Sequence, residues 1–287
     1  MREADSLSAI FARHKPHIVF HAAAHKHVPL VEACPAEGVK NNVLGSHNTA
    51  AAALAHGTDC FVLISTDKAV RPTNVMGATK RLAEHLVLAE NGKGTTRFMA
   101  VRFGNVLGSN GSLVQILQRQ IAKGGPVTIT HPKITRYFMT IPEAVGLVIV
   151  AAVQSESALC VLDMGKPLNV DSLAREMISL SGLIPDKDIE IVYTGLRPGE
   201  KMYEELFTEE EHRRPSAHPR IFLAEARPTP ADPNVILAAA REATLDGRDE
   251  TVRDFLRTYL PDYQPRDPAA PGTPARDGAI DAGAHAS

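Results

Sequence analysis

The chain has 287 residues, and its 31 lysine and arginine side chains against 33 acidic ones give a formal net charge of −2. This balance argues against a nucleic-acid-binding protein and against one that binds anionic membranes, because both usually carry a basic excess. The hydrophobic fraction of 44% is ordinary for a globular protein, and no apolar run is long enough to span a bilayer. As written, the sequence predicts a soluble cytoplasmic protein.

Short apolar segments alternate with longer helical ones in the first hundred residues. The sequence predicts strands over 18–20, 61–64 and 97–103, and helices over 6–14, 35–57 and 75–90. This alternation is typical of βαβ units and predicts a parallel sheet. Ligands of such sheets bind beyond the carboxyl ends of the strands, so we expect the functional residues shortly after residues 20, 64 and 101.

The second half of the chain is punctuated by proline and predicts shorter elements, which we interpret as a smaller mixed α/β lobe. Helices are predicted over 170–180 and 200–207, and the apolar run over 144–153 is predicted to be a buried helix. The charge run over 209–214 is most simply the solvated face of a helix.

A dinucleotide-binding domain normally opens with a strand, a G-x-G-x-x-G turn and a helix, which together hold the pyrophosphate. No such turn precedes residue 18, and the glycines of the segment 103–111 have the wrong spacing, so this segment is predicted to be a loop. We therefore expect an α/β fold with an N-terminally incomplete, Rossmann-like parallel sheet. The expected parts are a partial dinucleotide-binding domain over 1–106, a mainly substrate-binding lobe over 107–263 and a disordered tail over 264–287.

No metal site is expected. The three cysteines are far apart and form no C-x-x-C motif, so they are predicted to be small core residues. His21, His25 and His27 would share one face of an extended chain, but no cysteine or carboxylate lies within their run.

The most informative segment follows the second predicted strand. A hydroxyl, a carboxylate and an ammonium group adjoin there, at Thr66, Asp67 and Lys68. The carboxyl end of a parallel strand is where acid and base groups are useful. On the next helix, Met76 and Lys80 are four residues apart and share one face.

This segment resembles the extended short-chain dehydrogenase superfamily, whose members carry a Tyr-x-x-x-Lys pair on this helix. Five motifs in order are closer still to the membrane-associated nucleotide-sugar 4,6-dehydratases of polysaccharide biosynthesis. They occupy residues 21–32, 65–80, 102–106, 135–140 and 195–201. One such motif would be weak evidence, whereas five in order are specific.

The resemblance implies an NAD-dependent lyase that acts on UDP-N-acetylglucosamine or a close relative. In this reaction hydride leaves sugar C4 for NAD, a base removes the C5 proton, an acid helps the C6 hydroxyl leave as water, and hydride returns to C6. Asp67 and Lys68 match the family's acid and base. A lysine base must be neutral, so the pKa of Lys68 is expected to be lowered by burial or nearby cations. Thr66 is expected to form a hydrogen bond with the O4 hydroxyl, and Lys80 is expected to hold the nicotinamide ribose.

Met76 stands where the superfamily has its catalytic tyrosine. A thioether can neither accept nor donate the O4 proton. The resemblance places the chain in the large, membrane-anchored branch of the family, in which methionine is known at this position. The group that deprotonates O4 stays open between Lys80, acting through Thr66 or a water, and Lys68.

The resemblance assigns further residues to the cofactor and the substrate. The NAD-binding turn is expected at His21, Ala22 and Ala23. The residues expected to bind the UDP-sugar are Lys26, Asn105, Arg136, Arg197 and Glu200. Guanidinium groups suit the oxygens of a diphosphate. The alternative interpretation is that each of the two arginines forms a surface ion pair.

Two alternatives to a dehydratase remain open. A 4-epimerase of the same superfamily needs a tyrosine at position 76 and no acid–base pair for C6, so Met76 with Asp67 and Lys68 favours dehydration. A non-catalytic remnant is the other alternative, because the βαβ unit that would hold the pyrophosphate is missing. The family also implies self-association, and membrane contact only through a missing N-terminal region, which would place the protein at the cytoplasmic face of the inner membrane.

Overall fold

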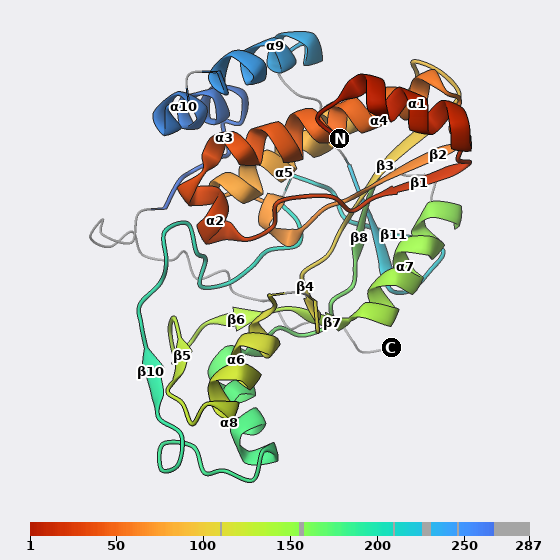
Figure 1. Cartoon of the computed structure of the whole chain (residues 1–287). Helices are drawn as coiled ribbons and strands as arrows, with labels where there is room; N and C mark the ends of the chain where they lie inside the picture. Colours follow the sequence, from red (N-terminus) through yellow and green to blue (C-terminus); the bar gives the residue numbers. More distant parts are fainter. Residues whose placement is uncertain (110, 155–157, 209, 226–230, 246, 267–287) are drawn as a thin grey trace.

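A six-stranded sheet in the order β1-β2-β3-β8-β12-β11 organises the chain, of which the computed structural model describes residues 1–109, 111–154, 158–208, 210–225, 231–245 and 247–266 (Figure 1). Its strands are β1 (Ile18–His21), β2 (Cys60–Ile64), β3 (Arg97–Arg102), β8 (Leu159–Leu162), β12 (Ile221–Ala224) and β11 (Arg214–Pro215). The first four are parallel, and β12 runs antiparallel to β8 and β11. The predicted parallel, Rossmann-like α/β sheet is therefore confirmed.

Helices cover both faces of this sheet (Figure 1). One face carries α1 (Ala4–His14), α4 (Gly45–Ala55) and α5 (Val75–Leu88), and the other carries α7 (Ile141–Gln154). Strand β2 is apolar at every position because it is enclosed on both sides: Phe61 and Leu63 face α4 and α5, whereas Val62 faces α7.

The helical stretch predicted over 35–57 is present but is not one regular helix. It consists of α3 (Pro35–Gly38), a π-helical segment (Val39–Leu44) and α4, and α2 (Val28–Ala33) precedes it. A hairpin of α9 (Pro233–Ala243) and α10 (Asp249–Tyr259) packs on the outside of α5 and the π-helical segment (Figure 1).

A smaller lobe lies beyond the carboxyl ends of the strands (Figure 1). Its elements are β4 (Asn105–Leu107), α6 (Leu113–Ala122), β5 (Val127–Ile129), β6 (Thr135–Arg136), β7 (Phe138–Thr140), β9 (Leu168–Asn169), α8 (Val170–Leu180) and β10 (Ile191–Tyr193). They pair as β4 with β7, β5 with β10, and β6 with β9. Within the range predicted for this lobe, 107–263, the elements α7, β8, β12 and the final hairpin pack on the main sheet and its helices.

Five local predictions after the third strand are wrong. Residues 200–207 form no helix, and charged side chains within them pair with distant residues, as Glu204 does with Lys68. In the charge run 209–214, position 209 lies outside the described residues and the rest is not a solvated helix: Glu211 is 1% exposed. The segment 103–111 contains the short strand β4.

The fourth error concerns the apolar run 144–153. It does form α7, but only one side of that helix is buried, and Val145, Ile149 and Val153 are exposed. The tail predicted from residue 264 also begins too early, because Gln264 and Arg266 are hydrogen-bonded to the fold through their backbones. The remaining residues of that tail, 267–287, lie outside the described residues.

Among the helices of the described residues, none combines the length and the apolar character that crossing a bilayer requires.

Candidate active site

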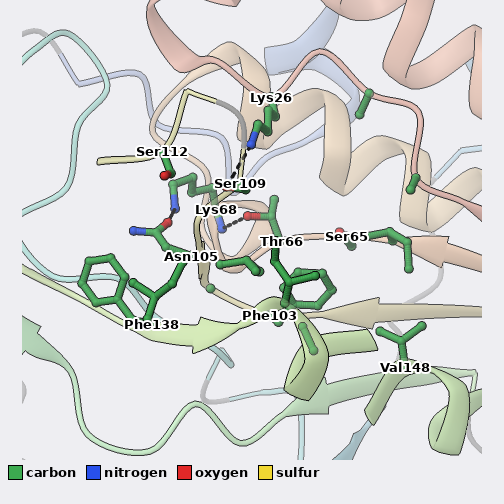
Figure 2. Close-up of a pocket in the computed structure, with 18 of the residues that line it drawn as sticks. Lys26, Ser65, Thr66, Lys68, Phe103, Asn105, Ser109, Ser112, Phe138 and Val148 are labelled. Carbon is green, nitrogen blue, oxygen red and sulfur yellow. Dashed lines mark hydrogen bonds between the residues drawn. The ribbon is translucent and has the colours of Figure 1, made fainter. Parts of the chain in front are cut away.

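A cavity of about 700 Å³ opens at the carboxyl ends of β1, β2 and β3, between the sheet and the smaller lobe. The segments that follow all three strands line it, and α7 supplies an apolar wall that includes Ile141, Val145 and Val148. Lys26, Lys68 and Asn105 reach the cavity from three separate segments (Figure 2).

Thr66, Asp67 and Lys68 form one hydrogen-bonded group just after β2. Asp67 Oδ1 accepts from the Thr66 hydroxyl at 2.8 Å and from Lys68 Nζ at 3.0 Å. Lys68 Nζ also donates to Asn105 Oδ1 at 3.2 Å (Figure 2). Lys68 lines the cavity, whereas Asp67 lies behind it and is 0% exposed. Any contact with a ligand is therefore made by Lys68 and not by Asp67.

A residue that the sequence did not single out completes this group. The Oε1 atom of Glu204 lies 3.4 Å from Lys68 Nζ and 3.6 Å from Arg136 Nε. Burial alone would lower the pKa of Lys68, but Asp67 and Glu204 outweigh it and raise this pKa above its ordinary value. The expectation of a lowered pKa at Lys68 is thus wrong. Burial raises the pKa of Asp67, and the negative charge of Glu204 raises it further.

The lysine whose pKa is lowered is Lys80, on α5. Burial lowers its pKa to about 8, and its Nζ donates to the carbonyl oxygen of Ile64 at 2.7 Å. Asn74 caps this helix by accepting the N–H of Gly77 at 2.7 Å. Met76 also lines the cavity, while most of its side chain packs in the core beneath the α9–α10 hairpin.

Only some residues of the turn after β1 line the cavity. Ala22 and Ala24 line it, but Ala23 does not, and His21 is turned into the core, where its Nε2 lies 3.0 Å from the Ser46 hydroxyl. Burial lowers the pKa of His21 to about 4, so its ring is neutral. The His21 side chain therefore does not line the cavity, whereas part of the turn after it does.

This turn is held in place by Asn42, in the π-helical segment. Its amide accepts the N–H of His25 at 2.7 Å and donates to the His25 carbonyl at 3.0 Å and to Thr79 Oγ1 at 3.0 Å. The next residue, Lys26, lines the cavity and lies 3.3 Å from the Ser109 hydroxyl (Figure 2). The π-helical segment thus ties the turn to α5.

Three expected substrate residues do not line the cavity. Arg136 is buried and donates to Glu200 Oε1 at 3.0 Å, and Glu200 Oε2 accepts the backbone N–H of Arg197 at 3.2 Å. The residue Arg197 is exposed. The structure therefore brings Lys26, Thr66, Lys68, Met76, Lys80 and Asn105 together at the cavity. It places Arg136, Glu200 and Arg197 beside this group, connected to it through Glu204.

The sequence is similar to proteins of polysaccharide biosynthesis. The family model described as "Polysaccharide biosynthesis protein" matches residues 1–226. The probable polysaccharide biosynthesis protein EpsC of Bacillus subtilis is 52% identical over 227 residues, which are 79% of this chain and 38% of EpsC. The capsular polysaccharide biosynthesis protein CapD of Staphylococcus aureus is 52% identical over 210 residues, 72% of this chain and 35% of CapD. The chain thus spans little more than a third of the length of these two relatives.

Two solved structures are similar to this chain in fold. Pen from Bacillus thuringiensis superposes with a TM-score of 0.71 at 35% identity, over 77% of this chain and 69% of Pen. A UDP-glucose 4-epimerase of Thermotoga maritima, at 21% identity and a TM-score of 0.64 over 72% of this chain and 74% of the epimerase, shares the fold. By sequence over most of its length, the chain belongs to the polysaccharide biosynthesis protein family, on a Rossmann-like α/β fold.

Proposed function

We propose that this protein catalyses the NAD-dependent dehydration of a UDP-N-acetylhexosamine, with UDP-N-acetylglucosamine as the first candidate, to the 4-keto-6-deoxy sugar. The observation that carries the proposal is the amine of Lys68 at the cavity wall, held 3.0 Å from Asp67 Oδ1 and 3.2 Å from Asn105 Oδ1. Loss of water across C5 and C6 needs a group that takes the C5 proton and gives a proton to the departing hydroxyl.

The residues at the cavity fit the nicotinamide ribose of NAD. Lys80 Nζ is buried and carries three N–H donors, yet among the described residues its one hydrogen bond is to Ile64 O. Its other donors suit the ribose hydroxyls, and the small side chains of Ala22 and Ala24 leave room beside them. When bound, NAD supplies the acceptor for the C4 hydride.

Lys68 and Asp67 can share one proton. Lys68 Nζ and Asp67 Oδ1 are 3.0 Å apart, and the raised pKa of Asp67 helps its carboxylate to accept the Lys68 proton along this hydrogen bond, which leaves a neutral amine at the cavity. Lys68 then takes the C5 proton of the 4-keto sugar and gives a proton to the departing C6 hydroxyl. Because Asp67 is fully buried, it acts on the sugar through Lys68.

A 4-epimerase is the second candidate. A UDP-glucose 4-epimerase of Rickettsia rickettsii is 37% identical over 203 residues, which are 70% of this chain and 58% of the epimerase. Met76 argues against this activity, since its thioether cannot carry the O4 proton that epimerisation moves twice.

The test is incubation of the chain with NAD and UDP-N-acetylglucosamine, followed by mass spectrometry and NMR. A product lighter by one water, with a 4-ketone, is the expected result. We expect Lys68→Met to slow its formation by roughly 10²–10⁴-fold, and Lys123→Met, at an exposed lysine outside the cavity, to leave it unchanged. Formation of UDP-N-acetylgalactosamine instead would show that the reaction is epimerisation and not dehydration. Absence of any product would contradict catalysis by this chain.

A further inference from the structure

We propose that Glu204 is a positioning residue of this site, whose carboxylate holds the amine of Lys68 against Asp67 and sets the charge that Lys68 carries. Its effect on catalysis rests on the proposed function above, whereas its effect on Lys68 does not.

The first support is the burial of Glu204. Its side chain is 4% exposed, in a segment without helix or strand. Its Oε1 lies 3.4 Å from Lys68 Nζ and 3.6 Å from Arg136 Nε, while its Oε2 is buried with no hydrogen-bond partner among the described residues. Burying a carboxylate is costly unless cations compensate it. The position of Glu204 is therefore defined by Lys68 and Arg136.

The second support is the number of acceptors around Lys68. Three oxygens, from Asp67, Asn105 and Glu204, lie within 3.4 Å of Nζ, as many as an ammonium group has N–H donors. They fix the direction of the amine and leave it facing the cavity beside Asn105. Without Glu204, one of these three acceptors is lost, and only Asp67 and Asn105 still hold the amine.

The third support is the charge balance. The charged groups that act on Lys68 are the carboxylates of Asp67 and Glu204 and the guanidinium of Arg136. Two further titratable groups act on these carboxylates: the hydroxyl of Tyr137 lies near Asp67, and the amine of Lys201 lies near Glu204. Two carboxylates against one guanidinium favour the charged amine. Replacing Glu204 with glutamine would leave one carboxylate against one guanidinium, which favours the neutral amine.

The experiment measures the reactivity of Lys68 directly. The intact chain is acetylated with trace acetic anhydride at a series of pH values, and the peptide containing Lys68 is quantified by mass spectrometry. Only the neutral amine reacts, so the curve reports its deprotonation. We expect Glu204→Gln to raise the labelling of Lys68 at fixed pH by about tenfold or more, as one pKa unit would. The matched control is Glu205→Gln, which removes the neighbouring carboxylate, paired with Lys201 at 3.2 Å, and should label Lys68 like the wild type.

Kinetics add a second readout. The dehydration rate of Glu204→Gln is expected to have its lower pH limit shifted to lower pH, and Glu204→Asp, which keeps the charge, to restore the profile towards wild type. Glu204→Ala, which also removes the charge, serves for the labelling if the glutamine variant fails to fold. Unchanged Lys68 labelling in Glu204→Gln would overturn the proposal. A shifted labelling curve without any dehydration product would support the role of Glu204 at Lys68 and contradict the proposed function instead.

Discussion

Gly77, in the first turn of α5, lies directly against the backbone of Lys68. A Cβ atom at position 77 would stand 2.2 Å from the Lys68 carbonyl oxygen and 3.0 Å from its carbonyl carbon. Only a residue without a side chain allows this approach. The loop that carries Asp67 and Lys68 is therefore held in fixed register with the helix that carries Met76 and Lys80.

Gly77→Ala is expected to displace this loop. Because the obstructing atoms belong to the backbone, the added methyl group cannot be absorbed by rotating a side chain, and we expect a loss of about 1–3 kcal/mol in the free energy of unfolding. The dehydration rate should fall as well, since Lys68 moves relative to Lys80. Urea unfolding and the product assay measure both effects.

Gly146→Ala in α7 is the matched control. A Cβ there would meet nothing within 4 Å, and alanine is the better helix former by roughly 0.5–1 kcal/mol. Stabilisation by this substitution, together with unchanged stability in Gly77→Ala, would show that the loop is not held by Gly77.

Met76→Leu tests whether the thioether takes part in the chemistry. Leucine has a similar volume and no proton to exchange, so in this core position we expect a cost below about 1.5 kcal/mol. The dehydration rate is expected to stay within a few-fold of wild type. A fall of more than roughly a hundredfold, the scale of a lost acid or base, would mean that Met76 does more than fill space.

The backbone of residues 264–266 clamps two loops of the site. Gln264 N donates to Pro72 O at 3.0 Å and Arg266 N to Thr73 O at 3.1 Å, while Gly199 N donates to Arg266 O at 2.9 Å. A chain ending at Tyr263 loses all three bonds and frees the segment that carries Arg197 and Glu200. We expect its KM for the nucleotide sugar to rise more than its kcat falls. A chain ending at Arg266 keeps the bonds and is the control; equal KM values for the two chains would contradict the clamp.

The main sheet and the residues at its strand ends were predictable because their signals are local. The apolar run of β2 is continuous, Asn74 stands next to the first turn it caps, and Thr66 to Lys68 are adjacent in sequence. Parallel strands then bring their carboxyl ends to one edge. The position of Asn105 beside Lys68 follows from this topology.

The acidic residues of the second half were not predictable in the same way. Glu204 and Glu211 stand in acidic runs whose local pattern resembles a helix face. Their actual positions are set by cations far away in sequence, at Lys68 and Arg136 for Glu204 and at Arg102 for Glu211. The direction of the pKa shift at Lys68 was missed for the same reason, since the deciding carboxylate belongs to a distant segment.

A buried ion cluster joins that distant segment to the sheet. Arg102, at the end of β3, is fully buried and donates to Glu211 Oε2 at 2.7 Å and Oε1 at 2.9 Å. It also donates to both carboxylate oxygens of Glu84, at 2.8 and 2.7 Å, and Arg81 donates to Glu211 at 2.7 Å. Two arginines and two glutamates thus neutralise one another, and two of the four, Arg81 and Glu84, belong to α5.

Glu211→Gln is expected to lower stability at neutral pH and to flatten its dependence on pH. Burial alone would raise the pKa of Glu211, but its hydrogen bonds with Arg102 outweigh it and lower the pKa to about 2 from an ordinary 4.5. A carboxyl with a depressed pKa stabilises the fold above its ordinary pKa, and this share, about 3 kcal/mol, is lost as pH falls from 4.5 to 2.

At pH 7 the variant should lose roughly 3–5 kcal/mol, because Arg102 and Arg81 keep their charge in the core with one carboxylate fewer. Urea unfolding at pH 7 and near pH 3 measures both effects, and Glu242→Gln, at an exposed glutamate, is the control. If the free energy of unfolding fell by the same amount from pH 7 to pH 3 in wild type and in Glu211→Gln, the idea that Arg102 keeps Glu211 ionised in acid would be contradicted.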